Sequence, residues 1–206
     1  MFPFDNLQQL FMKFPGVGPR QAKRFAYFLL RQGASYRKEL MVAIEKIGDA
    51  ISQCPECFRY FENSVGRLCD VCASSETNKT QLLIVEKDVD LDSIKRSGLY
   101  NGRYFILGGL LPLLERNPQE KIRIKELIAY IQTKAEEYGL KEIIFALSLN
   151  QEGDNTMQYV KKTIEPFSKE YNITVSSFGR GLSTGIEIEY SDPETLESAF
   201  LSRTNI

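Results

Sequence analysis

Four cysteines are the feature that most restricts how this chain can fold. They are the only cysteines among its 206 residues, and they form two pairs, Cys54 with Cys57 and Cys69 with Cys72. A pair at positions i and i+3 aims two thiolates at one point, and two such pairs complete a tetrahedron around a metal ion. Because the chain has no histidine, the spacing predicts one structural zinc ion per chain, held by four sulfur ligands.

Two disulfides or four buried free thiols are the other states that this spacing allows. Disulfides are disfavoured because we find no charged and then apolar leader that would direct the chain to an oxidising compartment. A site closed by four thiolates also leaves no open position for a substrate, so we expect a structural role and no catalysis at the metal.

The charges of the chain are unevenly distributed. The net charge is −1, yet residues 1–38 carry seven basic side chains and one acidic one, a net +6, which leaves −7 for the remainder. A basic head on an acidic body suggests that only the head meets a polyanion, although a solvated helix face would give the same count. No apolar run is long enough to span a bilayer, so we expect a cytoplasmic protein that contacts no membrane.

The basic head contains two predicted helices, residues 4–13 and 20–32, separated by Pro15-Gly16-Val17-Gly18-Pro19. This arrangement is similar to a helix-hairpin-helix motif. Glycines in such a hairpin let backbone N–H groups approach a phosphate, and the second helix offers its positive N-terminus to the same phosphate. We therefore predict sequence-independent DNA binding; the alternative is a purely structural turn. The DNA-binding candidates are Gly16, Gly18, Arg20, Lys23 and Arg24.

A third helix is predicted over residues 36–52, with Ser35 as its N-cap. Its apolar stripe of Leu40, Ile44, Ile47 and Ile51 requires burial against the first two helices or against another subunit. The loop between the cysteine pairs carries aromatic and arginine side chains that either stack on bases or cover the metal site, and we favour the second interpretation. These side chains are Phe58, Arg59, Tyr60, Phe61 and Arg67.

Beyond a polar linker at residues 73–80, strands alternate with helices, which predicts βαβ units and a doubly wound sheet. Near-continuous apolar runs indicate strands that are buried on both faces. A glycine-rich segment follows, in which Arg180 either binds a phosphate or belongs to a turn; Asp192 is the expected cap of the last helix. The expected strands are residues 81–86, 104–107, 141–147, 173–177 and 186–190, and the expected helices are 89–97, 122–138, 155–171 (bent by Pro166) and 194–203.

The order of these motifs resembles the bacterial RecR recombination-mediator family, and the α/β part looks like a Toprim domain. The resemblance covers nearly the whole chain. It predicts a multidomain fold of α and α/β parts: a helix-hairpin-helix domain (1–53), a four-cysteine zinc finger (54–73), a Toprim domain (80–177) and a C-terminal segment at a subunit interface (178–206). The motifs that carry the resemblance are the hairpin, the cysteine spacing, Val85-Glu86, Gly102-Arg103-Tyr104, Leu107-Gly108-Gly109, Glu152-Gly153-Asp154 and Gly179-Arg180-Gly181-Leu182.

The resemblance implies a role in recombinational DNA repair. Such proteins act with RecO and RecF to load the recombinase onto single strands coated by single-strand-binding protein. The resemblance also implies a homo-oligomer, a dimer or a ring-shaped tetramer, in the bacterial cytoplasm and associated with the nucleoid.

Catalytic Toprim domains hold magnesium with a glutamate after the first strand and a later Asp-x-Asp pair. Glu86 matches the glutamate, but Ser148 and Asn150 stand where the two aspartates are expected. We therefore expect no catalytic residues. The acidic side chains that remain, Glu86, Glu152 and Asp154, are the predicted binding patch for a protein partner, with helix capping as the alternative role for the last two.

Two other functions remain open from the sequence. One is a metal-dependent Toprim nuclease or primase-like enzyme that binds its ion through the same three carboxylates. The other is a structural scaffold that does not bind DNA.

Overall fold

The computed structural model describes residues 2–62, 66–115, 117–179, 182, 185, 187–191 and 193–201. The chain divides into two compact units, Met1–Ser52 and Gln53–Ile206, and each is described by itself. The finer division into four parts, 1–53, 54–73, 80–177 and 178–206, stays a prediction.

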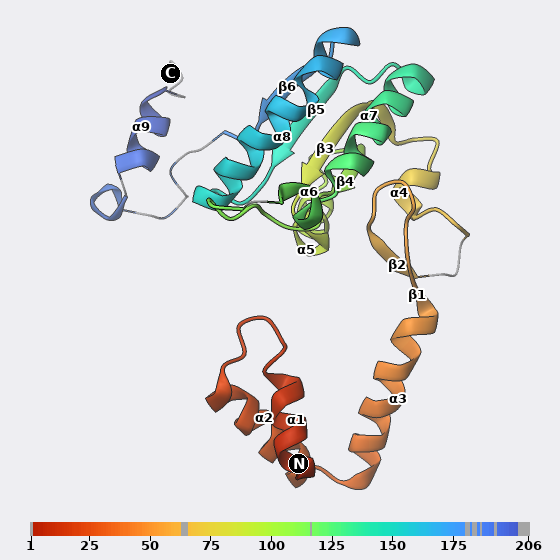
Figure 1. Ribbon diagram of the computed structural model, residues 1–206, viewed down its shortest axis with the longest axis vertical. Helices are drawn as coiled ribbons and strands as arrows, with labels where there is room; N and C mark the ends of the chain where they lie inside the picture. The colour runs from red at the N-terminus through yellow and green to blue at the C-terminus, as the bar shows by residue number, and fades with distance from the viewer. Residues whose placement is uncertain are drawn as a thin grey trace. The chain divides into compact units, whose positions relative to one another are not determined.

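The first unit is helical, with α1 (Pro3–Phe11), α2 (Pro19–Arg31) and α3 (Ala34–Ala50) (Figure 1). Helices α1 and α2 pack together and bury Ala22 and Ala26 completely, and the rings of Phe11 and Phe25 meet edge to face. The three predicted helices are confirmed to within a few residues. The cap is wrong: Gly33, with extended backbone, is the N-cap of α3, and no side chain caps the helix, so Ser35 lies inside the first turn.

Short elements surround the cysteines. Strands β1 (Ile51–Gln53) and β2 (Tyr60–Glu62) pair into a two-stranded sheet, and helix α4 (Asp70–Ala73) carries the second cysteine pair. None of the three was predicted, because each has only three or four residues and too short a pattern for periodicity.

A four-stranded parallel sheet forms the centre of the second unit. Its strands are β3 (Asn78–Val85), β4 (Gly102–Ile106), β5 (Glu142–Ala146) and β6 (Thr174–Ser177), in the order β4-β3-β5-β6. Leu83 lies opposite Tyr104 on one neighbour and Ile144 on the other. The four strands predicted between residues 81 and 177 are confirmed, and β4 is an edge of the sheet.

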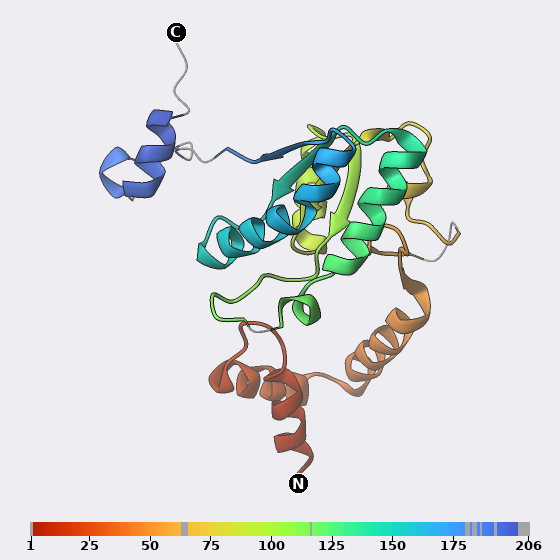
Figure 2. The ribbon, with the colours of Figure 1, turned by 45° about the horizontal axis from the view of Figure 1, so that its top comes forward.

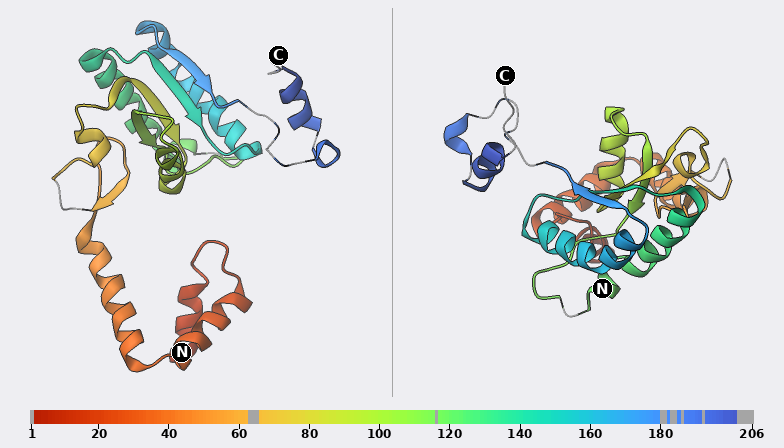
Figure 3. Two further views of the ribbon diagram at one scale, coloured as in Figure 1. Left: turned by 180° about the vertical axis from the view of Figure 1, so that it is seen from behind. Right: turned by 90° about the horizontal axis from the view of Figure 1, so that it is seen from above.

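Helices cover both faces of this sheet, as the apolar runs predicted. Helices α7 (Ile124–Tyr138) and α8 (Gln151–Glu170) lie side by side on one face (Figure 2), and α5 (Asp88–Ser97) lies on the other (Figure 3); α6 (Pro118–Lys121) is a single turn. Leu82 and Ile84 belong to the core under α7 and α8, whereas Leu83 and Val85 belong to the core under α5.

Helix α8 begins four residues earlier than predicted. Asn150 is its N-cap, and the side-chain oxygen of Asn150 accepts a hydrogen bond of 2.8 Å from the N–H of Gly153. A Cβ at Gly153 would overlap the carbonyl oxygen of Ser148, so only glycine fits at this helix start. Pro166 lies within α8.

Two short elements follow the sheet, a 3-10 turn η2 (Ile188–Tyr190) and helix α9 (Pro193–Leu201). The strand expected over residues 186–190 is therefore wrong, because Ile188–Tyr190 form a helical turn. The predictions for Arg180 and Asp192 lie outside the described residues. Within the described part of the chain, no helix combines the length and the apolar character needed to cross a membrane.

Candidate metal centre and nucleic-acid interface

The four cysteines come together in one buried cluster. Their exposed fractions are 0 to 5%, and the four sulfur atoms lie within 4.8 Å of one another. Sulfur atoms around a zinc ion with bonds of about 2.3 Å are separated by roughly 3.8 Å in a regular tetrahedron. The measured separation of 3.5 Å between Cys57 and Cys69 is close to this value and far longer than a disulfide bond. The donor set and its spacing fit a tetrahedral metal ion.

Two local structures aim the sulfurs at one point. In the first, a tight turn after β1, the N–H of Phe58 donates to the carbonyl of Cys54 and the N–H of Cys54 donates to the carbonyl of Arg59. In the second, Cys69 is the N-cap of α4 and Cys72 lies one turn later on the same side of that helix. Hydrogen bonds from the other three cysteines, Cys57 first, lower the pKa of Cys54, whereas hydrogen bonds led by the one with Cys54 raise the pKa of Cys57 and Cys72. Without a metal the four thiols thus share protons among themselves, and a metal ion would displace those protons because its ligands are thiolates.

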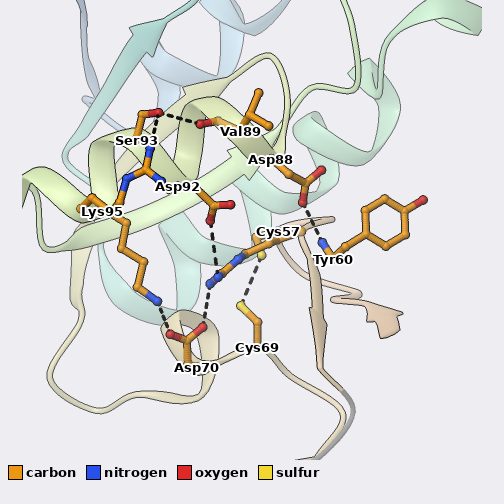
Figure 4. A network of polar contacts seen from close by, with 11 residues as sticks. Cys57, Tyr60, Cys69, Asp70, Asp88, Val89, Asp92, Ser93 and Lys95 are labelled. Atoms are coloured by element: carbon orange, nitrogen blue, oxygen red, sulfur yellow. Dashed lines mark hydrogen bonds and ion pairs between the residues drawn. The ribbon is translucent and has the colours of Figure 1, made fainter. Parts of the chain in front are cut away.

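Ion pairs join the cysteine loop to helix α5 (Figure 4). Arg59 contacts Asp70 at 2.7 Å and Asp92 at 3.7 Å, Lys95 also pairs with Asp70, and the N–H of Tyr60 donates to Asp88 at 2.8 Å. Burial alone would raise the pKa of Asp70, but Lys95 and Arg59 hold it below its ordinary value. Arg59 of the loop is thus engaged within the protein, whereas Arg67, the other arginine of the loop, is exposed.

A second set of contacts joins the loop to the edge strand β4. The N–H of Ile106 donates to the carbonyl of Cys57 at 2.9 Å, which satisfies a group that an edge strand would otherwise leave open. Phe58 packs against both cores of the sheet, and Phe61 packs against the cysteines. Of the three aromatic side chains in the loop, Phe61 thus covers the cysteine cluster as expected, whereas Phe58 belongs to the cores of the sheet and Tyr60 is 57% exposed.

The predicted DNA-binding residues gather at the hairpin between α1 and α2. Gly16 has φ of +74°, a backbone conformation that favours glycine. Gly18 is the N-cap of α2, has ordinary φ, and would accept a Cβ without touching any atom of the chain within 4 Å. The fold itself therefore does not require glycine at position 18. Because Gly18 has no side chain, its backbone groups are open to an approaching ligand.

The start of α2 has the features of an anion site. Proline occupies its first position, no side chain caps it, and its first turn contains no acidic residue. Arg20, Lys23 and Arg24 are all exposed next to these open backbone groups. Positive helix end, open N–H groups and basic side chains thus coincide on one surface.

The carboxyl ends of β3 and β5 bring Glu86 and Ser148 together. The Ser148 hydroxyl donates to Glu86 at 2.7 Å, and Lys87 pairs with the same carboxylate at 3.3 Å. Asn150 caps α8 instead of pointing to this pair. The position of an Asp-x-Asp motif is thus used for a hydrogen bond and a helix cap.

The three predicted patch residues differ in their surroundings. Glu86 is 15% exposed and engaged by Ser148 and Lys87, whereas Glu152 is exposed in the first turn of α8. Asp154 is half-buried and lines a small cavity of about 30 Å³ with Ser148 and Phe178. Within the described ranges, the four cysteines are the only group of three or more cysteine or carboxylate side chains close enough to hold a metal ion.

Comparisons with known proteins agree with this architecture. Residues 4–47 match the family described as RecR, helix-hairpin-helix, and residues 80–178 match the Toprim domain. The recombination protein RecR of Chloroflexus aurantiacus is 33% identical over 204 residues, which cover 99% of this chain and 95% of the relative. Those of Prochlorococcus marinus and Lactobacillus acidophilus are 33% and 31% identical, over 99% of this chain and 96% and 98% of theirs.

The chain belongs to the RecR family. Sequence reasoning nevertheless missed the roles of two residues beside the metal centre of this RecR-family chain. Arg103 and Lys134 flank the cysteine loop as buried cations, at 3% and 6% exposure. The sequence signal that could have found Arg103 is a basic residue inside an apolar strand, as in Gly102-Arg103-Tyr104. Lys134 lies on an ordinary amphipathic helix, so its sequence context contains no such signal.

Loss of one thiolate should break the metal centre of this RecR-family chain. In Cys57→Ser we expect bound metal to disappear and the thermal midpoint to fall by several degrees, because the loop loses its central cross-link. For a chain of this size, each 1 kcal/mol corresponds to about 2–4 °C. Metal analysis measures the bound metal, and calorimetry measures the thermal midpoint. Parent protein stripped by a chelator should melt like the variant; a variant that keeps the metal and the parental midpoint would contradict the assignment.

Proposed function

We propose that this protein is a non-catalytic, DNA-binding recombination mediator in recombinational repair. It acts with RecO- and RecF-like proteins to load the recombinase onto DNA coated by single-strand-binding protein. Membership of the RecR family supports the role in recombination, since the relatives are named recombination proteins. The observation that carries DNA binding is the uncapped start of α2 beside Gly18, with three exposed basic side chains around it.

The proposed metal is one structural zinc ion per chain, bound by Cys54, Cys57, Cys69 and Cys72. Soft thiolate ligands in a closed tetrahedral set favour zinc over the hard ions magnesium and calcium. The ion keeps the loop in place and, with all four positions occupied by protein, takes no part in chemistry.

DNA contact at the hairpin should depend on charge and on the backbone. Reversal of two charges in Arg20→Glu/Arg24→Glu should remove most DNA binding in a fluorescence-anisotropy titration over a salt series. If each arginine neutralises one phosphate of duplex DNA, the slope of log K against log salt becomes shallower by about 1.8. The matched control is Lys161→Glu/Lys162→Glu, an equal charge change at exposed positions of α8. An equal loss of DNA affinity in both double variants would show that the loss depends only on net charge and not on the hairpin.

Gly18→Ala tests the backbone contact without altering charge. The structure has room for the added Cβ, so the fold should survive, with about 0.5–1 kcal/mol lost because alanine is a poorer N-cap than glycine. Parental affinity in this variant and in the double arginine variant would make the hairpin purely structural.

We also propose a homo-oligomer, a dimer or a ring-shaped tetramer. Ile44 and Ile47 of the predicted stripe are 63% and 64% exposed in the single chain. A groove of about 280 Å³ lies in the same unit between the three helices, lined by Leu7, Phe11 and Leu40 among others. Apolar surface of this kind favours contact with a second copy.

Light scattering measures the assembly directly. At micromolar concentration the parent should have two or four times the chain mass of 23.6 kDa, and Ile47→Asp should lower that mass. Val89→Asp is the control, because Val89 is a similarly exposed apolar residue, at 60%, but belongs to α5 of the other unit. A monomeric parent, with and without DNA, would contradict the proposal.

We propose no catalysis at the Toprim site. Magnesium needs several charged oxygens converging on one octahedral ion, and the Glu86 carboxylate is occupied by Ser148 and Lys87. The acidic side chains Glu86, Glu152 and Asp154 instead form the proposed surface for a RecO-like partner, with Glu152 the most accessible of the three.

Loss of one carboxylate should separate partner binding from DNA binding. Glu152→Ala should weaken association with the RecO-like protein of the same organism in calorimetric titrations, while DNA affinity stays parental. Glu170→Ala, which removes an exposed carboxylate at the other end of α8, should have no effect. Magnesium- or manganese-dependent DNA cleavage that disappears in Glu86→Gln would instead support the nuclease alternative.

A further inference from the structure

Arg103 is a buried cation on the edge strand β4. Only 3% of it is exposed, its Nη1 donates to the Glu56 carboxylate at 2.8 Å, and its guanidinium lies over the ring of Tyr138 at 5.2 Å. Its Nε–H is also buried and has no hydrogen-bond partner of normal geometry within the described residues, although Tyr130 lies near enough to influence the pKa of Arg103. An unpaired donor in a protein interior is costly, so a missing acceptor is expected nearby.

Tyr130 has a similar unused donor in the same region. It lies on α7, is 7% exposed, and its buried hydroxyl has no hydrogen-bond partner within the described ranges. Burial lowers the pKa of Arg103, but Tyr130, Cys72 and Glu56 together raise it. Burial is the largest cause that raises the pKa of Tyr130, with Arg103 acting against it and Cys72 adding to it. Both donors adjoin the turn between Cys54 and Cys57, because Arg103 pairs with Glu56 in that turn and Tyr130 lines a cavity together with Pro55 and Glu56.

Short contacts fix Arg103 against the cysteine loop. Its partner Glu56 lies in the turn between Cys54 and Cys57, and Ile106 of the same strand binds the carbonyl of Cys57. On the other cysteine pair, the Thr77 hydroxyl donates to the carbonyl of Val71 at 2.9 Å. Strand β4 and the cysteine loop thus hold each other in register.

The position of Arg103 beside the cysteine loop matters because the metal centre would carry a buried negative charge. Four thiolates around a divalent cation carry a net charge of −2, and all four sulfurs are buried here. A buried net charge requires compensation, and arginine supplies a permanent positive charge because it does not deprotonate in proteins. The cysteine loop itself has Glu56, which adds negative charge and is paired with Arg103 and Lys134.

We propose that Arg103 and Tyr130 are positioning residues for the metal centre, with the guanidinium and the hydroxyl directed at the metal-bound thiolates. They offset the negative charge of the thiolates and thereby slow the loss of the metal. Because Arg103 belongs to the edge strand β4, binding of the metal and the stability of that strand then depend on each other. The inference rests on the proposed metal and is independent of DNA binding. Partners of metal ligands commonly change metal affinity by 10- to 100-fold.

Three variants separate this role from a simple ion pair. Arg103→Met removes the charge at similar length, Tyr130→Phe removes only the hydroxyl, and Glu56→Gln breaks the ion pair but keeps the guanidinium. Arg96→Met, at an exposed position of α5, is the matched control. The readouts are the rate of zinc transfer to a chromogenic chelator and the sulfur-to-cobalt charge-transfer band of Co²⁺-loaded protein.

In Arg103→Met we expect transfer about tenfold faster and a charge-transfer band at lower energy, because uncompensated thiolates donate electrons more readily. Tyr130→Phe should change both readouts in the same direction by less, while Glu56→Gln and Arg96→Met keep the parental band. If Arg103→Met does not fold, Tyr130→Phe decides alone.

Parental rates and bands in Arg103→Met, or in Tyr130→Phe if it decides alone, would overturn the inference. Equal acceleration in Arg103→Met and Glu56→Gln without a band shift would also overturn it, because the pair would then only hold the loop. A parent protein that takes up neither zinc nor Co²⁺ would refute the metal assignment itself, whereas the other failures leave that assignment intact.

Discussion

The convergence of four buried sulfurs is the constraint on which the second unit depends. The loop that carries them is too short to have a core of its own, so its order derives from the cysteines and from contacts with the sheet. Through Cys57 and Glu56 it covers the open edge of β4, and through Arg59 it holds α5. A metal ion at this point would stabilise the loop and the sheet edge together, because binding energy at a structural site is folding energy.

The sites of the protein differ in what they leave accessible. At the start of α2, Gly18 and the backbone remain open, and charge is provided by flexible exposed side chains. At the carboxyl ends of β3 and β5, Ser148 occupies Glu86 and Asn150 caps a helix. The first arrangement suits binding of a phosphate backbone, whereas the second satisfies its own polar groups. This contrast is the physical basis for proposing a binding protein with a Toprim fold and no Toprim chemistry.

Much of this could be predicted from sequence because the decisive signals are local. Cysteine spacing, the Pro-Gly-Val-Gly-Pro hairpin and the apolar runs of the strands each lie within a few residues. The missed contacts join distant positions: Ser148 and Glu86 are 62 residues apart, and Arg103 and Glu56 are 47 apart. Such pairs depend on strand order and register, which periodicity does not specify. The expected strand at residues 186–190 failed because alternation over so short a segment also fits a helical turn.

The most direct test of this account is the metal content of freshly purified protein. Elemental analysis against a protein concentration from amino-acid analysis should give one zinc per chain. Thiol titration should find the four cysteines unreactive until a chelator or denaturant is added. Protein that is folded with four reactive thiols and no metal above the buffer blank, or that contains another metal in place of zinc, would contradict the account.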